Sequence, residues 1–171
     1  KIVYYGLSFD SIPEFCVFIY CMDAWIPIIR NHNIGFDYVD NKGNPHKVYP
    51  DFIINGKLVE IKGSHFFKED GTMYLPYRNQ NWSYEEYEYQ SSIYESKRQC
   101  LIRNGVLIYK DTDPWVVGCV SWLESNLNIS LYIKSNPLNI CYGYSPFDIN
   151  KEDELRKQNP ELAAKIEAHQ N

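Results

Sequence analysis

The stretch of sequence that decides the fold reads YPDFIINGKLVEIKG and occupies residues 49–63. An Asn-Gly pair between two apolar runs is the strongest short-range signal for a β-hairpin, because both residues of a type I′ turn need a positive φ. With Asn55 and Gly56 as the turn, the two strands pair outward from it in a fixed register. Asp51 is then predicted to stand directly opposite Glu60.

The predicted hairpin has two different faces, because side chains alternate along a strand. Glu60 and Lys62 project from the same face. The other face is predicted to be apolar and to carry Phe52, Ile54, Val59 and Ile61. Directly opposed carboxylates repel each other and destabilise a sheet unless a cation lies between them. Mg²⁺ suits such a pair, since it takes one or two carboxylates and completes its shell with water and phosphate oxygens. The alternative is an ordinary hairpin with a solvated outer face, which gives no reason for the like-charge pairing.

Pro50-Asp51, followed by Glu60-Ile61-Lys62, resembles the signature of the PD-(D/E)xK nuclease superfamily. The resemblance implies an α/β fold with a restriction-endonuclease-like αβββαβ core and a mixed central sheet. It also implies a Mg²⁺ site, in which Mn²⁺ can substitute, formed by Asp51, Glu60 and the backbone carbonyl of Ile61. Lys62 would orient or activate the attacking water.

A further acid in this superfamily often comes from the first helix, and Glu14 is the matching position in this chain. Ser11 and Glu14 also form a capping box, in which the glutamate reaches back to the amide at the helix start. Both interpretations stay open and can both be partly true: Glu14 can cap the helix and can also belong to the metal site. Residues 11–63 most resemble the phage junction-resolving endonuclease I family. Carried over position by position, the active-site residues of that family would be Glu14, Asp51, Glu60 and Lys62.

The activity implied by the resemblance is Mg²⁺-dependent hydrolysis of DNA phosphodiester bonds by an endonuclease of phage or mobile-element origin, acting in the host cytoplasm. One alternative is a resolvase of Holliday junctions and other branched DNA with the same fold. Another is a DNA-binding or assembly protein that keeps the fold without catalysis, and a third is an RNA nuclease. DNA is the expected partner, a homodimer is left open, and neither a membrane nor an organic cofactor is expected.

The remaining elements follow in the order that the resemblance implies. Capping and periodicity predict helices over residues 11–26, 83–104 and 112–127. Runs of β-branched and aromatic residues predict strands over 2–5, 26–30, 34–39, 46–54, 106–109 and 129–133, with the second hairpin strand after Gly56. The nuclease domain is predicted to span residues 1–134. Residues 135–171 are predicted to form a C-terminal extension with a short helix over 160–168.

Composition narrows the class of protein. The chain has 171 residues, of which 44% are hydrophobic, and this is typical of a globular domain. Its apolar runs are interrupted well before the length that a membrane span requires. A net charge of −5 argues against broad nonspecific coating of nucleic acid. Five cysteines lack zinc-ligand spacing and are predicted to be reduced thiols: Cys16, Cys21, Cys100, Cys119 and Cys141.

Basic and aromatic residues after the hairpin suggest contacts with nucleic acid. Lys97, Arg98 and Arg103 lie on the predicted second helix and can neutralise backbone phosphates. The alternative is that these charges are solvated and favour the end of the helix dipole. The irregular, aromatic segment 66–82 is predicted to overhang the site. The tyrosines at helical spacing after it are expected to pack the helix on the sheet more than to stack on bases.

Overall fold

The structure is a computed structural model that describes residues 2–4 and 7–127. The predicted strand over 129–133, the C-terminal extension with its helix, and Cys141 lie outside the described residues. The predicted division into two domains at residue 134 therefore stays a prediction. No described helix combines the length and the apolar character that crossing a membrane requires.

A mixed four-stranded sheet forms the centre of the molecule and confirms the α/β class. It consists of β3 (Ile28–Arg30), β6 (Phe52–Ile54), β7 (Lys57–Lys62) and β8 (Leu107–Lys110), in that order across the sheet. The first three strands pair antiparallel, and β8 lies parallel to β7. A parallel neighbour requires a long crossover connection, which the segment containing α2 supplies.

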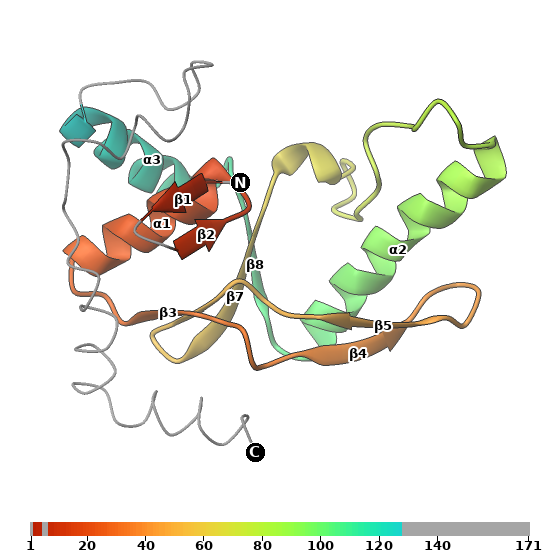
Figure 1. The fold of residues 1–171 in the computed structure, drawn as a ribbon, viewed down its shortest axis with the longest axis horizontal. Helices are drawn as coiled ribbons and strands as arrows, with labels where there is room; N and C mark the ends of the chain where they lie inside the picture. The colour runs from red at the N-terminus through yellow and green to blue at the C-terminus, as the bar shows by residue number, and fades with distance from the viewer. Residues whose placement is uncertain (1, 5–6, 128–171) are drawn as a thin grey trace.

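Two helices cover one face of this sheet. Helices α1 (Ile12–Asp23) and α3 (Pro114–Leu127) pack against each other, as Figure 1 shows at the side of the molecule where the chain begins. Most of α1 is apolar, and Phe18, Cys16 and Val17 are fully buried in the main core. Pro114 lies in the first position of α3, where its missing N–H costs no helical hydrogen bond.

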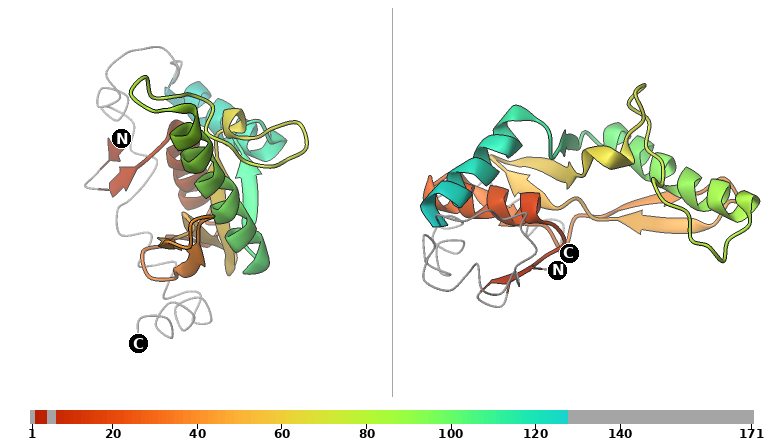
Figure 2. Two further views of the ribbon diagram at one scale, coloured as in Figure 1. Left: turned by 90° about the vertical axis from the view of Figure 1, so that its right-hand side faces the viewer. Right: turned by 90° about the horizontal axis from the view of Figure 1, so that it is seen from above.

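A long arm, formed by residues 36–48 and 84–103, extends from the other face of the sheet. Strands β4 (Phe36–Val39) and β5 (Pro45–Val48) form a separate antiparallel ribbon inserted between β3 and β6. Helix α2 (Tyr84–Arg103) runs alongside this ribbon in the views of Figures 1 and 2. The C-terminal half of α2 buries Cys100 and Leu101 against the ribbon and against β8. The molecule is therefore elongated, with the sheet between a helical end and the arm.

The hairpin of β6 and β7 has the predicted register. Phe52 pairs with Val59, and Ile54 pairs with Lys57. The turn residues Asn55 and Gly56 have φ values of 50° and 77°, as a type I′ turn requires. The predicted apolar face lies on the main core, where Phe52, Val59 and Ile61 are buried.

The second face of the hairpin, predicted to carry Glu60 and Lys62, also carries apolar residues. Ile53 is buried there against Ile29 and Ile34, with Leu58 and Phe36 packed beside them. Alternation still holds, but the inserted ribbon and α2 cover the turn end of this face with a second apolar cluster. Only the far end of the hairpin, at Asp51, Glu60 and Lys62, is left for polar chemistry.

The helices agree with the predictions more closely than the strands do. Ser11 and Ser83 cap α1 and α2 as predicted, since the hydroxyl of each accepts a backbone N–H three residues later. The predicted strand 46–54 is instead two strands, because the chain leaves the ribbon at Tyr49 and Pro50 and joins the central sheet at Phe52. The short strand β2 (Leu7–Phe9), paired with β1 (Ile2–Tyr4), was missed.

The described cysteines are buried and unpaired, as predicted: Cys16, Cys21, Cys100 and Cys119. Burial raises the pKa of the Cys21 thiol to about 12 and that of Cys119 to about 11. These thiols are protonated at neutral pH and pack as small apolar side chains.

Candidate functional site

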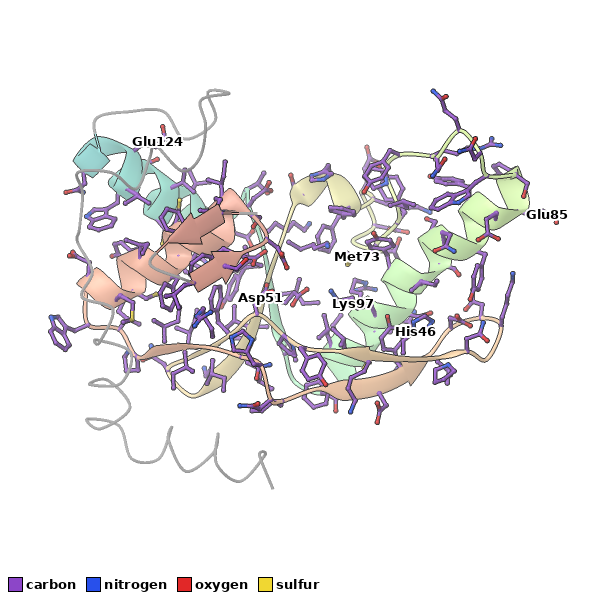
Figure 3. All side chains as sticks on the ribbon, in the orientation of Figure 1. His46, Asp51, Met73, Glu85, Lys97 and Glu124 are labelled. Atoms are coloured by element: carbon purple, nitrogen blue, oxygen red, sulfur yellow. The ribbon has the colours of Figure 1, made fainter. Side chains whose placement is uncertain are left out.

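A cleft of about 520 Å³ lies where the end of the hairpin meets the first turn of α1 and the middle of α2. Its lining brings together all four predicted catalytic residues, namely Glu14, Asp51, Glu60 and Lys62. Lys97 enters the same cleft from α2. Figure 3 shows Asp51 near the centre of the molecule and Lys97 between that point and α2. Residues up to 83 positions apart in sequence thus converge on one cavity.

Asp51 lies one position before the first residue of β6, and the register of the hairpin extended by one position places it opposite Glu60, as predicted. Its carboxylate accepts a hydrogen bond from the backbone N–H of Ile61, with the nitrogen and Oδ2 2.7 Å apart. This contact fixes Asp51 against the strand that carries Glu60 and Lys62. Ile61 itself lines the cleft together with both acids.

Asn31 holds the backbone on the other side of Asp51. The side chain of this buried residue donates to the carbonyls of Ile34 and Pro50, both at 2.8 Å, and accepts from the N–H of Ile34 at 3.0 Å. Its own backbone N–H donates to the carbonyl of Asp51 at 2.9 Å. Asn31 therefore positions the Pro50-Asp51 segment. Sequence reasoning missed it, because a lone Asn after a strand looks like any turn residue.

Glu60 is the most buried acid of the cleft, with only 5% of its surface exposed. Its Oε1 accepts a hydrogen bond from the Lys97 ammonium at 2.9 Å. Its Oε2 is buried and has no hydrogen-bond partner among the described residues. A buried carboxylate oxygen without a partner is costly, so Glu60 has a coordination position available for a cation or a donor.

Glu14 fits both interpretations that the sequence left open. It lies in the first turn of α1, where the Ser11 hydroxyl caps the helix and donates to Oε1 of Glu14 at 3.0 Å. Its side chain also lines the acid cleft. Ser11 is the cap and Glu14 is its hydrogen-bond partner, so the capped first turn of α1 also places the Glu14 carboxylate in the cleft.

The pKa values of Asp51 and Glu14 are both raised in the cleft. Burial raises the pKa of Asp51 well above its ordinary value, and the neighbouring charges of Glu60 and Glu14 raise it further. Burial also raises the pKa of Glu14, although hydrogen bonds from Ser11 and the backbone oppose this shift. Both shifts arise first from burial and are increased by like charges, so the ionised acids are poorly compensated, and a divalent cation bound in the cleft would relieve this.

Lys62 lies on an aromatic surface at the edge of the cleft. Its ammonium is 4.2 Å from the ring centre of Phe66 and 5.5 Å from that of Tyr94. These two rings stack with their centres 5.4 Å apart. Burial and the nearby Lys97 charge together lower the pKa of Lys62. The aromatic contacts hold the ammonium beside the acids without tying it to a carboxylate in any ion pair between described residues.

The loop after Lys62 also contributes to the cleft. The ring of His65 lies against Gly63, where a Cβ atom would be only 2.4 Å from Cε1 of the imidazole. Gly63 therefore allows the chain to fold back so that His65 and Phe66 line the cleft. Asp111 fastens this loop, since it accepts from the N–H of Ser64 at 2.8 Å and donates its own N–H to the carbonyl of Lys62 at 3.0 Å. The prediction that segment 66–82 borders the site holds for its first residue.

The oxygen atoms of the cleft are suited to a divalent cation that needs few protein ligands. Among residues 2–4 and 7–127, no three His, Cys, Asp or Glu side chains form a ready-made cluster of metal ligands. Mg²⁺ does not require one, because it keeps several waters and uses one or two carboxylates with substrate oxygens. Asp51, the unpartnered oxygen of Glu60 and the carbonyl of Ile61 fit that requirement, with Glu14 close by.

The three residues predicted to bind nucleic acid lie in different surroundings. Lys97 lies inside the cleft and forms an ion pair with Glu60. Arg98 makes a bidentate ion pair with Glu95, at 2.7 and 2.8 Å. Arg103 is exposed in the last turn of α2. The structure brings only Lys97 to the predicted catalytic residues.

Comparison of the chain with protein-family models, with curated proteins and with solved structures finds no match.

Proposed function

We propose that the cleft is the active site of a Mg²⁺-dependent endonuclease of the PD-(D/E)xK type, which hydrolyses phosphodiester bonds in DNA. The observation that carries the proposal is the meeting of Asp51, Glu60 and Lys62 at one end of the hairpin, with an oxygen of Glu60 left unpartnered. The element order also supports it. Helix α1, strands β3, β6 and β7, helix α2 and strand β8 correspond to an αβββαβ core, into which the ribbon of β4 and β5 is inserted.

Each residue has a role in the proposed reaction. Asp51, Glu60 and the carbonyl of Ile61 would hold Mg²⁺, with Glu14 as a further ligand or as a partner for metal-bound water. When bound, Mg²⁺ would polarise the phosphate and make a water more acidic. Lys62 orients that water and helps to remove its proton, which its lowered pKa favours. The water oxygen bonds to phosphorus while one phosphorus–oxygen ester bond breaks, and the products are a phosphomonoester and a hydroxyl.

The test is Mg²⁺-dependent cleavage of supercoiled, linear, single-stranded and four-way-junction DNA by the wild type and by Lys62→Ala. Lys57→Ala is the matched control, since Lys57 is exposed at the opposite end of the same strand. We expect the wild type and Lys57→Ala to cut and Lys62→Ala to lose about 10²-fold or more in rate. Preference for the four-way junction would identify the resolvase. Failure of the wild type to cut any DNA with Mg²⁺ or Mn²⁺ would contradict the proposal, and cleavage of RNA instead would change its substrate.

A further inference from the structure

Lys97 is the cation that balances Glu60 in the structure, through the carboxylate oxygen Oε1, next to the unpartnered Oε2. Its ammonium lies 2.9 Å from Oε1 of Glu60, and 27% of its side chain remains exposed to the cleft. The partner carboxylate is almost completely buried, so the ion pair is shielded from water on the side of Glu60 and open on the side of Lys97. The exposed Lys97 ammonium can therefore leave the pair while the buried Glu60 carboxylate stays in place.

A divalent cation and the Lys97 ammonium compete for the same carboxylate. Bound between Asp51 and Glu60, the cation would lie within a few ångströms of the ammonium, where like charges repel strongly in a partly desolvated cleft. Lys97 has a flexible four-carbon stem and extends from α2, which packs on the sheet through other residues. The ammonium can therefore swing away while the helix stays in place.

A phosphate in the cleft gives the displaced ammonium a new partner. Lys97, Lys62 and the acids line the same cavity, so a phosphate that contacts a metal at Asp51 and Glu60 also comes within the reach of Lys97. Lys62 already rests on Phe66 and Tyr94. Of the two lysines that line the cleft, only Lys97 forms an ion pair with an acid that would bind the metal, namely Glu60.

We propose that Lys97 is an exchangeable counter-ion that occupies the Glu60 carboxylate until metal and a nucleic-acid phosphate arrive together, and then transfers to the phosphate. This inference rests on the proposed metal-dependent nuclease function and deepens it. Its consequence is positive coupling between metal and nucleic acid, since each makes room for the other. The free protein holds metal weakly, and the nucleic-acid complex holds it tightly.

The experiment measures Mn²⁺ binding to the full chain without nucleic acid, by the loss of the free-ion electron paramagnetic resonance signal. Lys97→Met keeps the length of the side chain and removes the charge, whereas Lys97→Arg keeps the charge. Lys68→Met is the control, because Lys68 lies over the ring of Tyr74 and does not line the cleft. We expect Lys97→Met to bind Mn²⁺ about tenfold more tightly than the wild type, because the ammonium no longer competes with the metal for Glu60. Lys97→Arg and Lys68→Met should bind like the wild type.

A second experiment measures the transfer of Lys97 to phosphate. Binding of a DNA duplex is followed by fluorescence anisotropy at several salt concentrations, with Ca²⁺ replacing Mg²⁺. The slope of log affinity against log salt reflects the number of phosphates that the protein neutralises. For Lys97→Met, its magnitude should be smaller than for Lys68→Met by about the contribution of one phosphate contact. In this variant, DNA should also no longer tighten the binding of metal.

The outcomes separate this inference from the proposed function. Unchanged or weaker Mn²⁺ binding by Lys97→Met would overturn the inference and leave the nuclease intact. Tighter Mn²⁺ binding by a protein that cuts no nucleic acid would keep Lys97 as a counter-ion and overturn the nuclease. Absence of Mn²⁺ binding in every variant would overturn both.

Discussion

Two aspartates in this protein have opposite surroundings: Asp40 is buried in the arm, and Asp51 is half-buried in the cleft. Asp40, at the tip of the ribbon, is only 5% exposed, yet both of its oxygens are fully engaged. Oδ1 accepts from the N–H groups of Lys42 and Asn44 at 2.9 and 3.0 Å, and Oδ2 contacts His46 at 2.8 Å and the hydroxyl of Tyr89. Asp51 is half-buried, and among the described residues its carboxylate receives one hydrogen bond, from the N–H of Ile61.

The pKa values of the two groups move in opposite directions for this reason. Burial alone would raise the pKa of Asp40, but the hydrogen bonds from Tyr89, His46 and the backbone outweigh it and lower the value. At Asp51, burial and the like charges of Glu60 and Glu14 act together and raise the value. Burial of an acid therefore does not by itself indicate a functional site. What marks it is burial without enough donors.

The largest expected effect is on catalysis. Asp51→Asn should lower the cleavage rate by about 10³-fold, because a neutral amide loses several kcal/mol of metal-assisted stabilisation. The same change should raise the melting temperature of the metal-free protein, since it removes a repelling charge. Asp37→Asn is the control, with 83% of that side chain exposed on β4. Rates on a fixed DNA substrate and thermal melts in EDTA measure both effects. A melting temperature lowered by Asp51→Asn would mean that the cleft acids stabilise the fold, as Asp40 does.

Asp40→Asn should change stability in the opposite direction. The amide keeps the shape of the carboxylate but places an NH₂ group against N–H and O–H donors, so the turn and its contact with α2 are both weakened. We expect the melting temperature to fall by several degrees, while Mn²⁺ binding at the distant cleft stays unchanged. Calorimetry and the Mn²⁺ titration check the two statements. Weaker metal binding would show that the arm and the cleft are coupled, contrary to the comparison.

The pH dependence of stability sharpens the contrast further. The pKa of Asp40 is lowered on folding, so its contribution is present above the ordinary aspartate value near 4 and is lost as the pH falls below it. The pKa of Asp51 is raised on folding, so its penalty is absent below about pH 4 and grows as the pH rises toward the raised value. In EDTA, the stability gained by Asp51→Asn should therefore be largest at pH 7 and should vanish near pH 4. Urea unfolding at several pH values measures this, and a gain that persists at pH 4 would refute it.

The parts of the fold that the sequence predicted are those set by local chemistry. The turn at Asn55 and Gly56 fixes the hairpin register, and the serine caps fix where α1 and α2 begin. The meeting of Asp51 with Glu60 follows from that register alone. These features depend on neighbours within a few residues, so the sequence specifies them directly.

The parts that were missed depend on residues far apart in the chain. The Lys97–Glu60 ion pair spans 37 positions and the Asn31–Pro50 hydrogen bond spans 19. Both require the placement of α2 and of the ribbon, which no local pattern encodes. The split between β5 and β6 was missed because apolar residues continue on both sides of Pro50, and only tertiary pairing shows that the two halves belong to different sheets. The sequence offered only Asn31 directly after a β-branched run, and a lone Asn at that place is typical of any turn.

The hydrogen bonds of Asn31 also bear on how this architecture can diversify. They join the chain where it leaves the central sheet to the point where it returns, so the excursion that holds β4 and β5 begins and ends at a closed base. A ribbon attached in this way can be lengthened or shortened at its tip by two residues at a time, which preserves the alternation of its faces, while Asp51 keeps its position. The reach of the ribbon can thus change without moving Asp51 at its base.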